Sequence, residues 1–476
     1  MVVIKKVSMS AAVFVRLITL GLGIGLTGCS TLLPEINKPE QAYLDIPVKW
    51  QIESVDQPII EKPFLNSVSG LLMQSKLTSL IKEALDHNPD LNQLALEVQA
   101  SGLLLKQVSA KRVPTLDLVM NASKNRRFEN ITNSYEFGLN VAWEIDLWGQ
   151  LADLESATES DFTAQKWEYT AVRNLIAMSV VRLWLEGWAL SEIQRIEQRY
   201  LGSLNNVEKL VLESYRDGLV QLADLSAIRV QQESTRSDMI ATIELISRNH
   251  REMELLLGRA PSADSLIDVN ELPEIMMPPT ILPAKVIAQR PDIQAAFYRL
   301  KSNYANRFAQ YKALLPSINI NGSLSKVGDS ASLNQIFGSD IVWSLVGGVA
   351  QPLFNSGSLR AQAEASSATA EASWWAYRKT VLTSLQEVEN ALFMEHSLAQ
   401  QLDRLAKVRL EVMQMKSINE EKYRSGLVDI FDLIESRLAV LEIDAHIIQM
   451  KAARMDNRML LALAMGFGLE AANENK

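Results

Sequence analysis

The chain is poor in the residues that build disulfides and metal sites. It has one cysteine, Cys29, and four histidines among its 476 residues. A single cysteine excludes an internal disulfide, and no histidine has a second one at the spacing of a metal-binding motif such as H-E-x-x-H. We also find no G-x-S-x-G and no phosphate-binding loop. The sequence therefore predicts no catalytic residues, no metal site and no bound cofactor.

Positive charge and long apolar segments are also scarce. Acidic residues outnumber basic ones, so the formal net charge is -9, and no basic cluster is present. This composition argues against nucleic acid as a partner. After the N-terminal leader, no segment offers the roughly 20 apolar residues that a transmembrane helix needs. We therefore expect no membrane-spanning helix, while a contribution of strands to a membrane barrel stays open.

The N-terminus has the layout of an export signal. Three positive charges precede a short uncharged run that ends in Leu26-Thr27-Gly28-Cys29. This tetrapeptide resembles the bacterial lipobox, whose cysteine is acylated and becomes the first residue of the mature chain. We predict a signal peptide over 1–28, a covalent lipid on Cys29 and a lipidated arm over 29–75. In lipoproteins that carry this motif, the residue after the cysteine directs sorting. Here that residue is Ser30 and not Asp, which favours delivery to the outer membrane.

The rest of the chain consists of two similar copies. Two motifs of the first copy recur in the second, at offsets of 202 and 208 residues: Asn88-Pro89-Asp90 as Arg290-Pro291-Asp292, and Tyr215-Arg216-Asp217-Gly218-Leu219-Val220 as Tyr423-Arg424-Ser425-Gly426-Leu427-Val428. Self-similarity at one long period indicates two copies of one structural unit. We assign the first repeat to 76–260, a proline-rich linker to 261–283 and the second repeat to 284–476. Repeated units usually build a symmetric bundle, barrel or channel wall, so we expect function to depend on shape.

Each copy contains a pair of alternating apolar and polar segments. These predict strands over about 115–123 and 135–146 in the first copy, and 317–325 and 341–352 in the second. An apolar face beside a polar face is typical of a barrel wall between lipid and water. The alternative is a pair of amphipathic hairpins packed on a soluble core. Because the smallest membrane barrels need about eight strands, four strands that enter a membrane must be pooled by several chains.

Each copy also contains one very long helix. The segments 149–215 and 357–423 contain no proline, and each predicts about 65 residues of helix, or roughly 100 Å. Shorter helices are predicted on both sides, over 77–113 and 221–257 in the first copy and over 284–315 and 429–464 in the second. Two short helices placed end to end can line one long antiparallel helix. The predicted fold class is mixed but mainly α, with long helical hairpins and four strands.

These features together resemble the outer-membrane factor (TolC-like) family, and most closely its lipoprotein branch, which serves resistance-nodulation-division efflux pumps. The motifs that carry the resemblance are the lipobox, Trp143-Glu144-Ile145-Asp146-Leu147-Trp148-Gly149, Gln351-Pro352-Leu353-Phe354-Asn355-Ser356-Gly357 and the two Tyr-x-x-Gly turns. The resemblance implies a homotrimer whose chains give four strands each to one twelve-stranded outer-membrane barrel above a periplasmic helical tunnel. It also implies a periplasmic adaptor and an inner-membrane transporter as partners.

The implied function is the exit duct of an efflux system for drugs or other small solutes. A duct for type I protein secretion or for metal-ion efflux fits the same pattern. A scaffold lipoprotein of the periplasm, without a channel, is the alternative from another class. Detergent dependence after removal of the acyl chain would separate a barrel from a scaffold.

The helix turns hold the candidate site residues. The resemblance places Asp432, Glu435 and Tyr423 at the closed periplasmic entrance, and Asp224 is the repeat partner of Asp432. Ala227 stands where the second copy has Glu435, so the first copy carries fewer acids. The alternative is that acids in a first helical turn only complement the helix dipole and face water.

The two turns themselves are candidates for contact with the adaptor. Gly218 and Gly426 suit the left-handed position that follows a long helix. The candidate contact residues at the hairpin tips are Arg216, Gly218, Leu219, Arg424, Gly426 and Leu427. The alternatives for the two arginines are a bridge between neighbouring helices or simple solvation.

Overall fold

The computed structural model describes residues 46–51, 75–128, 130–262, 275–278, 281, 283–328, 338 and 340–468. The predicted signal peptide, Cys29, and most of the predicted arm and linker lie outside these residues. The described chain divides into two compact units. A sheet unit is described from Lys111–Leu154 and Asn303–Ala372, and a helix unit from parts of Ile46–Ala110, Glu155–Ser302 and Ser373–Lys476.

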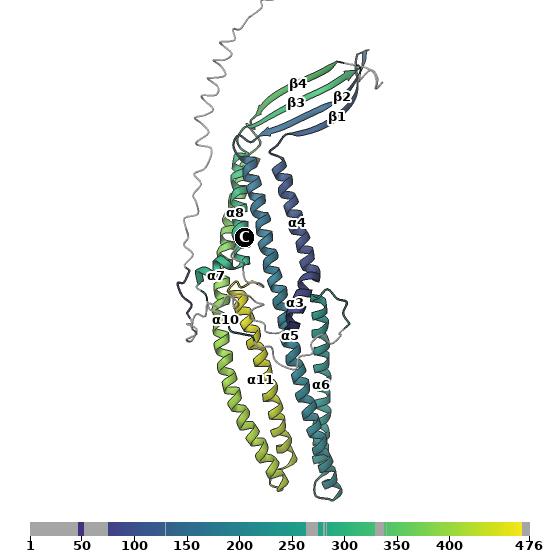
Figure 1. Cartoon of the computed structure of the whole chain (residues 1–476), viewed down its shortest axis with the longest axis vertical. Helices are drawn as coiled ribbons and strands as arrows, with labels where there is room; N and C mark the ends of the chain where they lie inside the picture. Colours follow the sequence, from purple (N-terminus) through teal and green to yellow (C-terminus); the bar gives the residue numbers. More distant parts are fainter. Residues whose placement is uncertain are drawn as a thin grey trace, which may run out of the picture. The chain divides into compact units, whose positions relative to one another are not determined.

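The sheet unit contains one antiparallel sheet of four strands in chain order (Figure 1). The strands are β1 (Thr115–Arg127), β2 (Asn130–Ile145), β3 (Ser317–Gly328) and β4 (Ile341–Ala350). The pattern placed the end of β4 at residue 352, but the strand stops at 350. Pro352 has no backbone N–H to donate to a ladder, which accounts for the earlier end.

Much of the apolar surface of this sheet is exposed in the single chain. Leu116, Leu118 and Met120 of β1 are each about two-thirds exposed, and every residue of β4 is exposed. β1 and β4 form the two edges, and neither has a second partner strand among the described residues. Long exposed edges with apolar side chains are templates for pairing with another chain.

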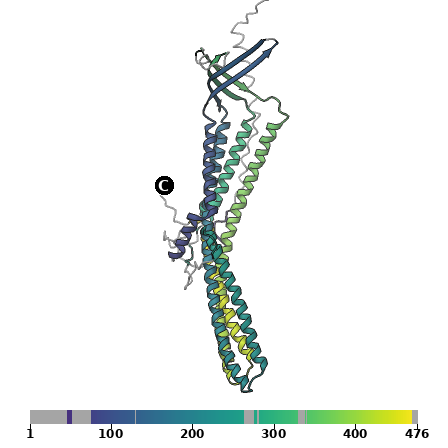
Figure 2. The same ribbon diagram turned by 90° about the vertical axis from the view of Figure 1, so that its right-hand side faces the viewer.

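The helix unit contains most of two long hairpins (Figure 2), although the first residues of their long helices belong to the sheet unit. Helices α5 (Gln150–Arg216) and α10 (Ser358–Arg424) have 67 residues each, which corresponds to roughly 100 Å. Each turns back into a helix of 35 residues, α6 (Leu222–Leu256) or α11 (Ile430–Ala464). The four helices keep the 208-residue offset at both ends, and the predicted mainly helical fold class with four strands is confirmed.

The shorter helices are divided where the sequence predicted continuous ones. The segment predicted over 77–113 forms α3 (Ser75–His87) and α4 (Pro89–Ala110), and the segment predicted over 284–315 forms α7 (Pro283–Gln289) and α8 (Pro291–Lys312). A proline cannot continue a helix, but its fixed φ suits the first position of a new one. The repeated X-Pro-Asp motif therefore marks a break between two helices.

The core of the helix unit lies along the hairpins. Side chains such as Trp184, Leu185, Leu204, Val388 and Leu461 are fully or almost fully buried. None of the described helices has the length and apolar character needed to cross a membrane.

Candidate functional site

Each long hairpin reverses direction at a glycine turn. Gly218 has φ of 73° and Gly426 has φ of 69°, a left-handed conformation that a side chain would strain. After each glycine, a leucine N–H closes the helix end. Leu219 donates to Ser214 O at 2.8 Å, and Leu427 donates to Lys422 O at 2.9 Å. Both turns therefore have the same Schellman geometry.

The predicted adaptor-contact residues lie on the surface of these turns. Leu219 is 76% exposed and Leu427 is 74% exposed, and Arg216 and Arg424 are also exposed. Each turn thus presents an Arg-x-Gly-Leu segment to solvent. The role of these residues in adaptor contact stays a prediction.

The helices that follow the turns are capped differently, although their acids are repeat partners. At the start of α6, the Asp224 carboxylate accepts a hydrogen bond from Gln221 N–H at 2.8 Å and completes a capping box. At the start of α11, Asp429 caps instead, because its carboxylate accepts from Asp432 N–H at 3.0 Å. Asp224 is therefore engaged in holding the local structure.

The side chains of Asp432 and Glu435 take no part in this helix capping. Both residues are exposed. Neither carboxylate has a hydrogen bond or an ion pair within the part of the chain that the structure describes. Two negative charges per chain therefore face water at the tip of the second hairpin.

The two hairpins meet at a buried apolar cluster, which we call the tip core. It consists of Val207, Val211, Leu225, Ile228, Ile430, Leu433 and Ile434. Tyr423 is partly buried and packs against the tip core. Burial, and secondly the charge of the Asp224 carboxylate, raise the pKa of Tyr423. The structure thus brings Tyr423 of one hairpin close to Asp224 of the other, while Asp432 and Glu435 form no described hydrogen bond or ion pair with either.

Sequence reasoning missed Arg437, which joins three helices near the tip core. Its guanidinium donates from α11 to Ser203 Oγ of α5 at 2.5 Å and to Glu420 Oε1 of α10 at 2.8 Å. Its repeat partner Arg229 pairs with Glu208 Oε1 at 2.9 Å. The shared 208-residue offset of the two arginines was the signal that could have identified them.

A second repeated contact occurs where helices meet end to end. In the first copy, Asn88 Nδ2 donates to the carbonyl oxygen of Leu256 at 3.1 Å. In the second copy, Arg290 Nη1 donates to the carbonyl oxygen of Ala464, also at 3.1 Å. Carbonyls at a helix C-terminus lack partners within the helix, and in both copies the residue before the repeated proline donates to one of them.

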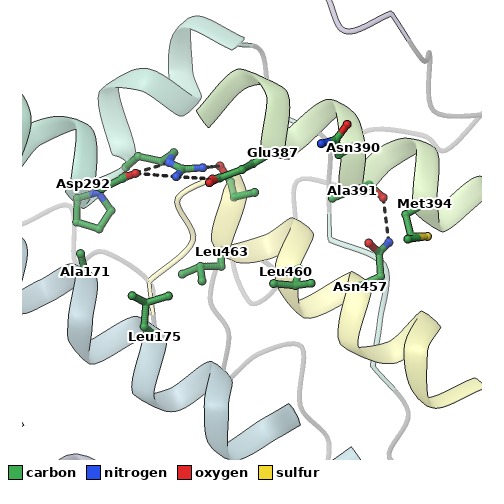
Figure 3. A pocket seen from close by; sticks show the side chains of 13 residues that line it. Ala171, Leu175, Asp292, Glu387, Asn390, Ala391, Met394, Asn457, Leu460 and Leu463 are labelled. Atoms are coloured by element: carbon green, nitrogen blue, oxygen red, sulfur yellow. Dashed lines mark hydrogen bonds and ion pairs between the residues drawn. The ribbon is translucent and has the colours of Figure 1, made fainter. Parts of the chain in front are cut away.

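Arg290 does more than its repeat partner. Its guanidinium also pairs with Asp292 and Glu387, with Nη2 2.7 Å from a carboxylate oxygen of each, and its side chain is only 9% exposed. Beside it lies a largely apolar cavity of about 560 Å³, lined in part by Leu175 of α5 and Leu463 of α11 (Figure 3). The two carboxylates neutralise the guanidinium, so this site holds the helix ends together and is not built to bind an anion.

Comparison with known proteins identifies the family. The model for the outer membrane efflux protein family matches residues 80–259 and 282–467, one segment in each repeat. The cation efflux system protein CusC of Escherichia coli is 25% identical over 471 residues, covering 95% of this chain and 98% of that protein. The toluene efflux pump outer membrane protein TtgC of Pseudomonas putida is 24% identical over 461 residues, covering 93% of both chains.

The fold comparison agrees with the family match. The open-state structure of the Neisseria gonorrhoeae MtrE outer membrane channel has a TM-score of 0.80 to this chain at 22% identity, covering 90% of this chain and 97% of that one. The predicted resemblance, the outer-membrane location and the efflux function are confirmed at the level of the family. The chain belongs to the outer membrane efflux protein family.

Proposed function

We propose that three copies of this chain form the exit duct of a tripartite efflux system, together with a periplasmic adaptor and an inner-membrane transporter. The observation that carries the proposal is the sheet, which has four strands, an exposed apolar face and two edges that no other described strand pairs with. Unpaired backbone groups at an open edge are too costly in lipid. Joining the β1 edge of one chain to the β4 edge of the next satisfies them. Three is the number of chains that the family resemblance implies.

The entrance of this duct lies at the tips of the hairpins in our proposal. Asp432 and Glu435 carry charges that no other described residue neutralises, whereas the Asp224 carboxylate is used in a helix cap. Three chains would bring six free carboxylates around one axis. A narrow wall of low dielectric focuses such a field and attracts cations. We therefore assign ion selectivity at the entrance to Asp432 and Glu435, and a packing role between the hairpins to Tyr423.

The adaptor binds the two glycine turns of each chain. Arg216 with Leu219, and Arg424 with Leu427, present similar charged and apolar groups on equivalent turns. A trimer would display six such turns, so one kind of adaptor subunit could use both copies. The lipid on Cys29 anchors the assembly to the outer membrane in addition to the strands.

The cargo is small solutes selected by the transporter. One relative is named for cation efflux and another for toluene efflux, and both match this chain over nearly its whole length. Such similar ducts for different solutes favour a conduit that does not itself choose the cargo. Drugs and other small organic molecules are therefore the proposed cargo, with metal ions as the second candidate.

The test combines assembly with transport. The native mass of the purified protein in detergent should correspond to three chains, and the protein should form pores in planar bilayers. In cells that supply an adaptor and a transporter with which the wild-type protein restores drug efflux, Leu219→Asp with Leu427→Asp should abolish efflux and keep the trimer and its conductance. As a control, Leu210→Asp changes a leucine of α5 that is 62% exposed but does not lie in a turn, and it should keep efflux. A soluble monomer without pores would refute the proposal.

A further inference from the structure

The internal repeat extends to the pairing of individual residues in the sheet. In the first copy, Thr115 of β1 pairs with Ala142 of β2. In the second, Ser317 of β3 pairs with Ala350 of β4. Ser317 follows Thr115 by 202 residues and Ala350 follows Ala142 by 208, the same offsets that relate the sequence motifs. The two strand pairs therefore have identical registers.

The structure also shows how the two copies pair within the sheet, where β2 of the first copy meets β3 of the second. Ala142 of β2 pairs with Asn321 of β3, which lies four residues beyond Ser317, since 321 minus 317 is 4. Moving across the sheet by one repeat, from β1 to β3, thus shifts the strand register by four residues. In a closed barrel the stagger between strands is linked to strand tilt and to barrel size. A regular barrel built from this unit keeps the same shift at every junction.

We infer from this symmetry the register in which neighbouring chains join. The inference rests on the proposed function, because it requires that several chains pool their strands. Repeating the β2–β3 junction between chains pairs β4 of one chain with β1 of the next, antiparallel. Ala350 then pairs with Val119 of the partner subunit, as Ala142 pairs with Asn321 within the chain. Two residues along, Gly348 pairs with Asn121 of the partner subunit, as Asn140 pairs with Ser323.

The faces of the strands agree with this register. In β1 the apolar face carries even-numbered residues such as Met120, and in β4 the large side chains of Trp343, Leu345 and Val349 are odd-numbered. The proposed register pairs odd with even positions and sets Val349 beside Met120 of the partner subunit. Both side chains are at least two-thirds exposed in the single chain. A shift by one residue would put apolar side chains on opposite faces. A register shifted by two residues would keep the apolar side chains on the same face. The experiment must therefore distinguish registers that differ by two residues.

One position differs between the proposed β4–β1 junction of neighbouring chains and the β2–β3 junction within a chain. At Gly138 a Cβ would overlap the side chain of Ser325 and lie 2.5 Å from Leu324 O. The repeat partner of Gly138 is Val346, which has a side chain. We therefore expect the strands to be slightly further apart at Val346. At Gly348, no described residue of the same chain other than its two chain neighbours has an atom within 4 Å of an added Cβ, so the chain itself leaves room for cysteine there.

Disulfide cross-linking tests the register. Gly348→Cys is combined with Asn121→Cys, on the water-facing side, and the assembled protein is oxidised in outer membranes. Directly opposite residues have Cβ atoms about 4.5–5.5 Å apart, and diagonal ones about 7–8 Å apart. The proposed pair should therefore give covalent dimers and trimers at several-fold higher yield than Gly348→Cys combined with Val119→Cys or with Ser123→Cys.

Two controls accompany the test. Asn140→Cys with Ser323→Cys is the same repeat position inside one chain, and it should form a disulfide without joining chains. Gly348→Cys alone reports any reaction with Cys29, which is the only native cysteine. If the Gly348 variants do not assemble, Val349→Cys with Met120→Cys tests the same register on the apolar face with a lipid-soluble oxidant.

The outcomes separate the register from the proposed function. Highest yield with a shifted pair, in an intact trimer, overturns the register and leaves the duct standing. Lack of any cross-link between chains in an intact trimer, while the control within the chain reacts, shows that β1 and β4 do not meet in this way and also overturns the register. A monomer by native mass refutes the proposed function itself.

Discussion

Neutralising the free acids at the hairpin tip should change conduction while leaving the fold almost unchanged. The perturbation is Asp432→Asn together with Glu435→Gln. Because neither carboxylate has a described partner, its loss removes only the favourable interaction with the helix N-terminus, about 0.3–1 kcal/mol for an exposed group. The matched control is Asp224→Asn, which weakens the capping box by removing the charge that accepts from Gln221 N–H. Because the amide oxygen can still accept that hydrogen bond, the control should cost only the charge at the helix N-terminus, about 0.3–1 kcal/mol. It removes one charge per chain where the double variant removes two, so it should alter conduction less.

The size of the conduction effect follows from the charge count. In a pore with a radius on the order of 10 Å, each carboxylate attracts a monovalent cation on the axis by about 0.4 kcal/mol in water, so six carboxylates contribute about 2.5 kcal/mol. Screening at 0.15 M salt reduces this to about 0.7 kcal/mol, equivalent to about a threefold excess of cations. At 0.01 M salt the screening length is about 30 Å, and the excess grows to about twentyfold.

Single-channel recording in planar bilayers at several salt concentrations provides the measurement. The wild-type trimer should be cation-selective, increasingly so as salt is lowered, and the double variant should lose most of this selectivity. The control variant should retain it, even if its trimer melts at a lower temperature. Equal selectivity and equal salt dependence in wild type and double variant would refute the reasoning and leave both acids as solvated helix-start residues.

Three further changes test the strand faces, a buried acid and the anchor. Leu139→Arg should cost about 2–4 kcal/mol near mid-membrane and lower trimer yield in membranes, whereas Asn140→Arg should not; equal yields would contradict a lipid-facing strand. Burial raises the pKa of Glu197, which accepts from Thr242 Oγ1 at 2.9 Å, so its contribution to stability is present at low pH and lost as the pH rises. Glu197→Gln should therefore raise the melting temperature at pH 7 but not near pH 4, and an equal gain at both would count against it. Cys29→Ser should abolish labelling with radioactive palmitate but keep the trimer, and label that persists would disprove lipidation.

The sequence predicted the elements of this fold because their signals are local. Alternation of apolar and polar residues indicated all four strands, and the absence of proline over long segments indicated α5 and α10. The glycine turns were recognisable because only glycine readily adopts φ near 70° at the end of a helix, as Gly218 and Gly426 do. The helix breaks before Pro89 and Pro291 were missed, although the same residues had been noted as repeat markers.

The roles of the site residues were less predictable. Asp224 and Asp432 are repeat partners with similar surroundings in the sequence, and only the structure shows that one carboxylate caps a helix and the other does not. Tyr423 was predicted at the entrance from the resemblance, but its proximity to Asp224 depends on how the two hairpins pack. Arg437 was missed because its partner Ser203 lies 234 residues away.

The sequence by itself determined that this chain is a twofold repeat of strands and long helices, because hydrophobic period, proline and glycine act over a few residues. The tertiary structure alone decided which acids remain free, which side chains join the hairpins and how the two copies meet at the β2–β3 junction, where Ala142 pairs with Asn321. Those contacts join residues far apart in the chain. Their formation depends on burial, charge pairing and strand stagger summed over whole elements, which no short stretch of sequence contains.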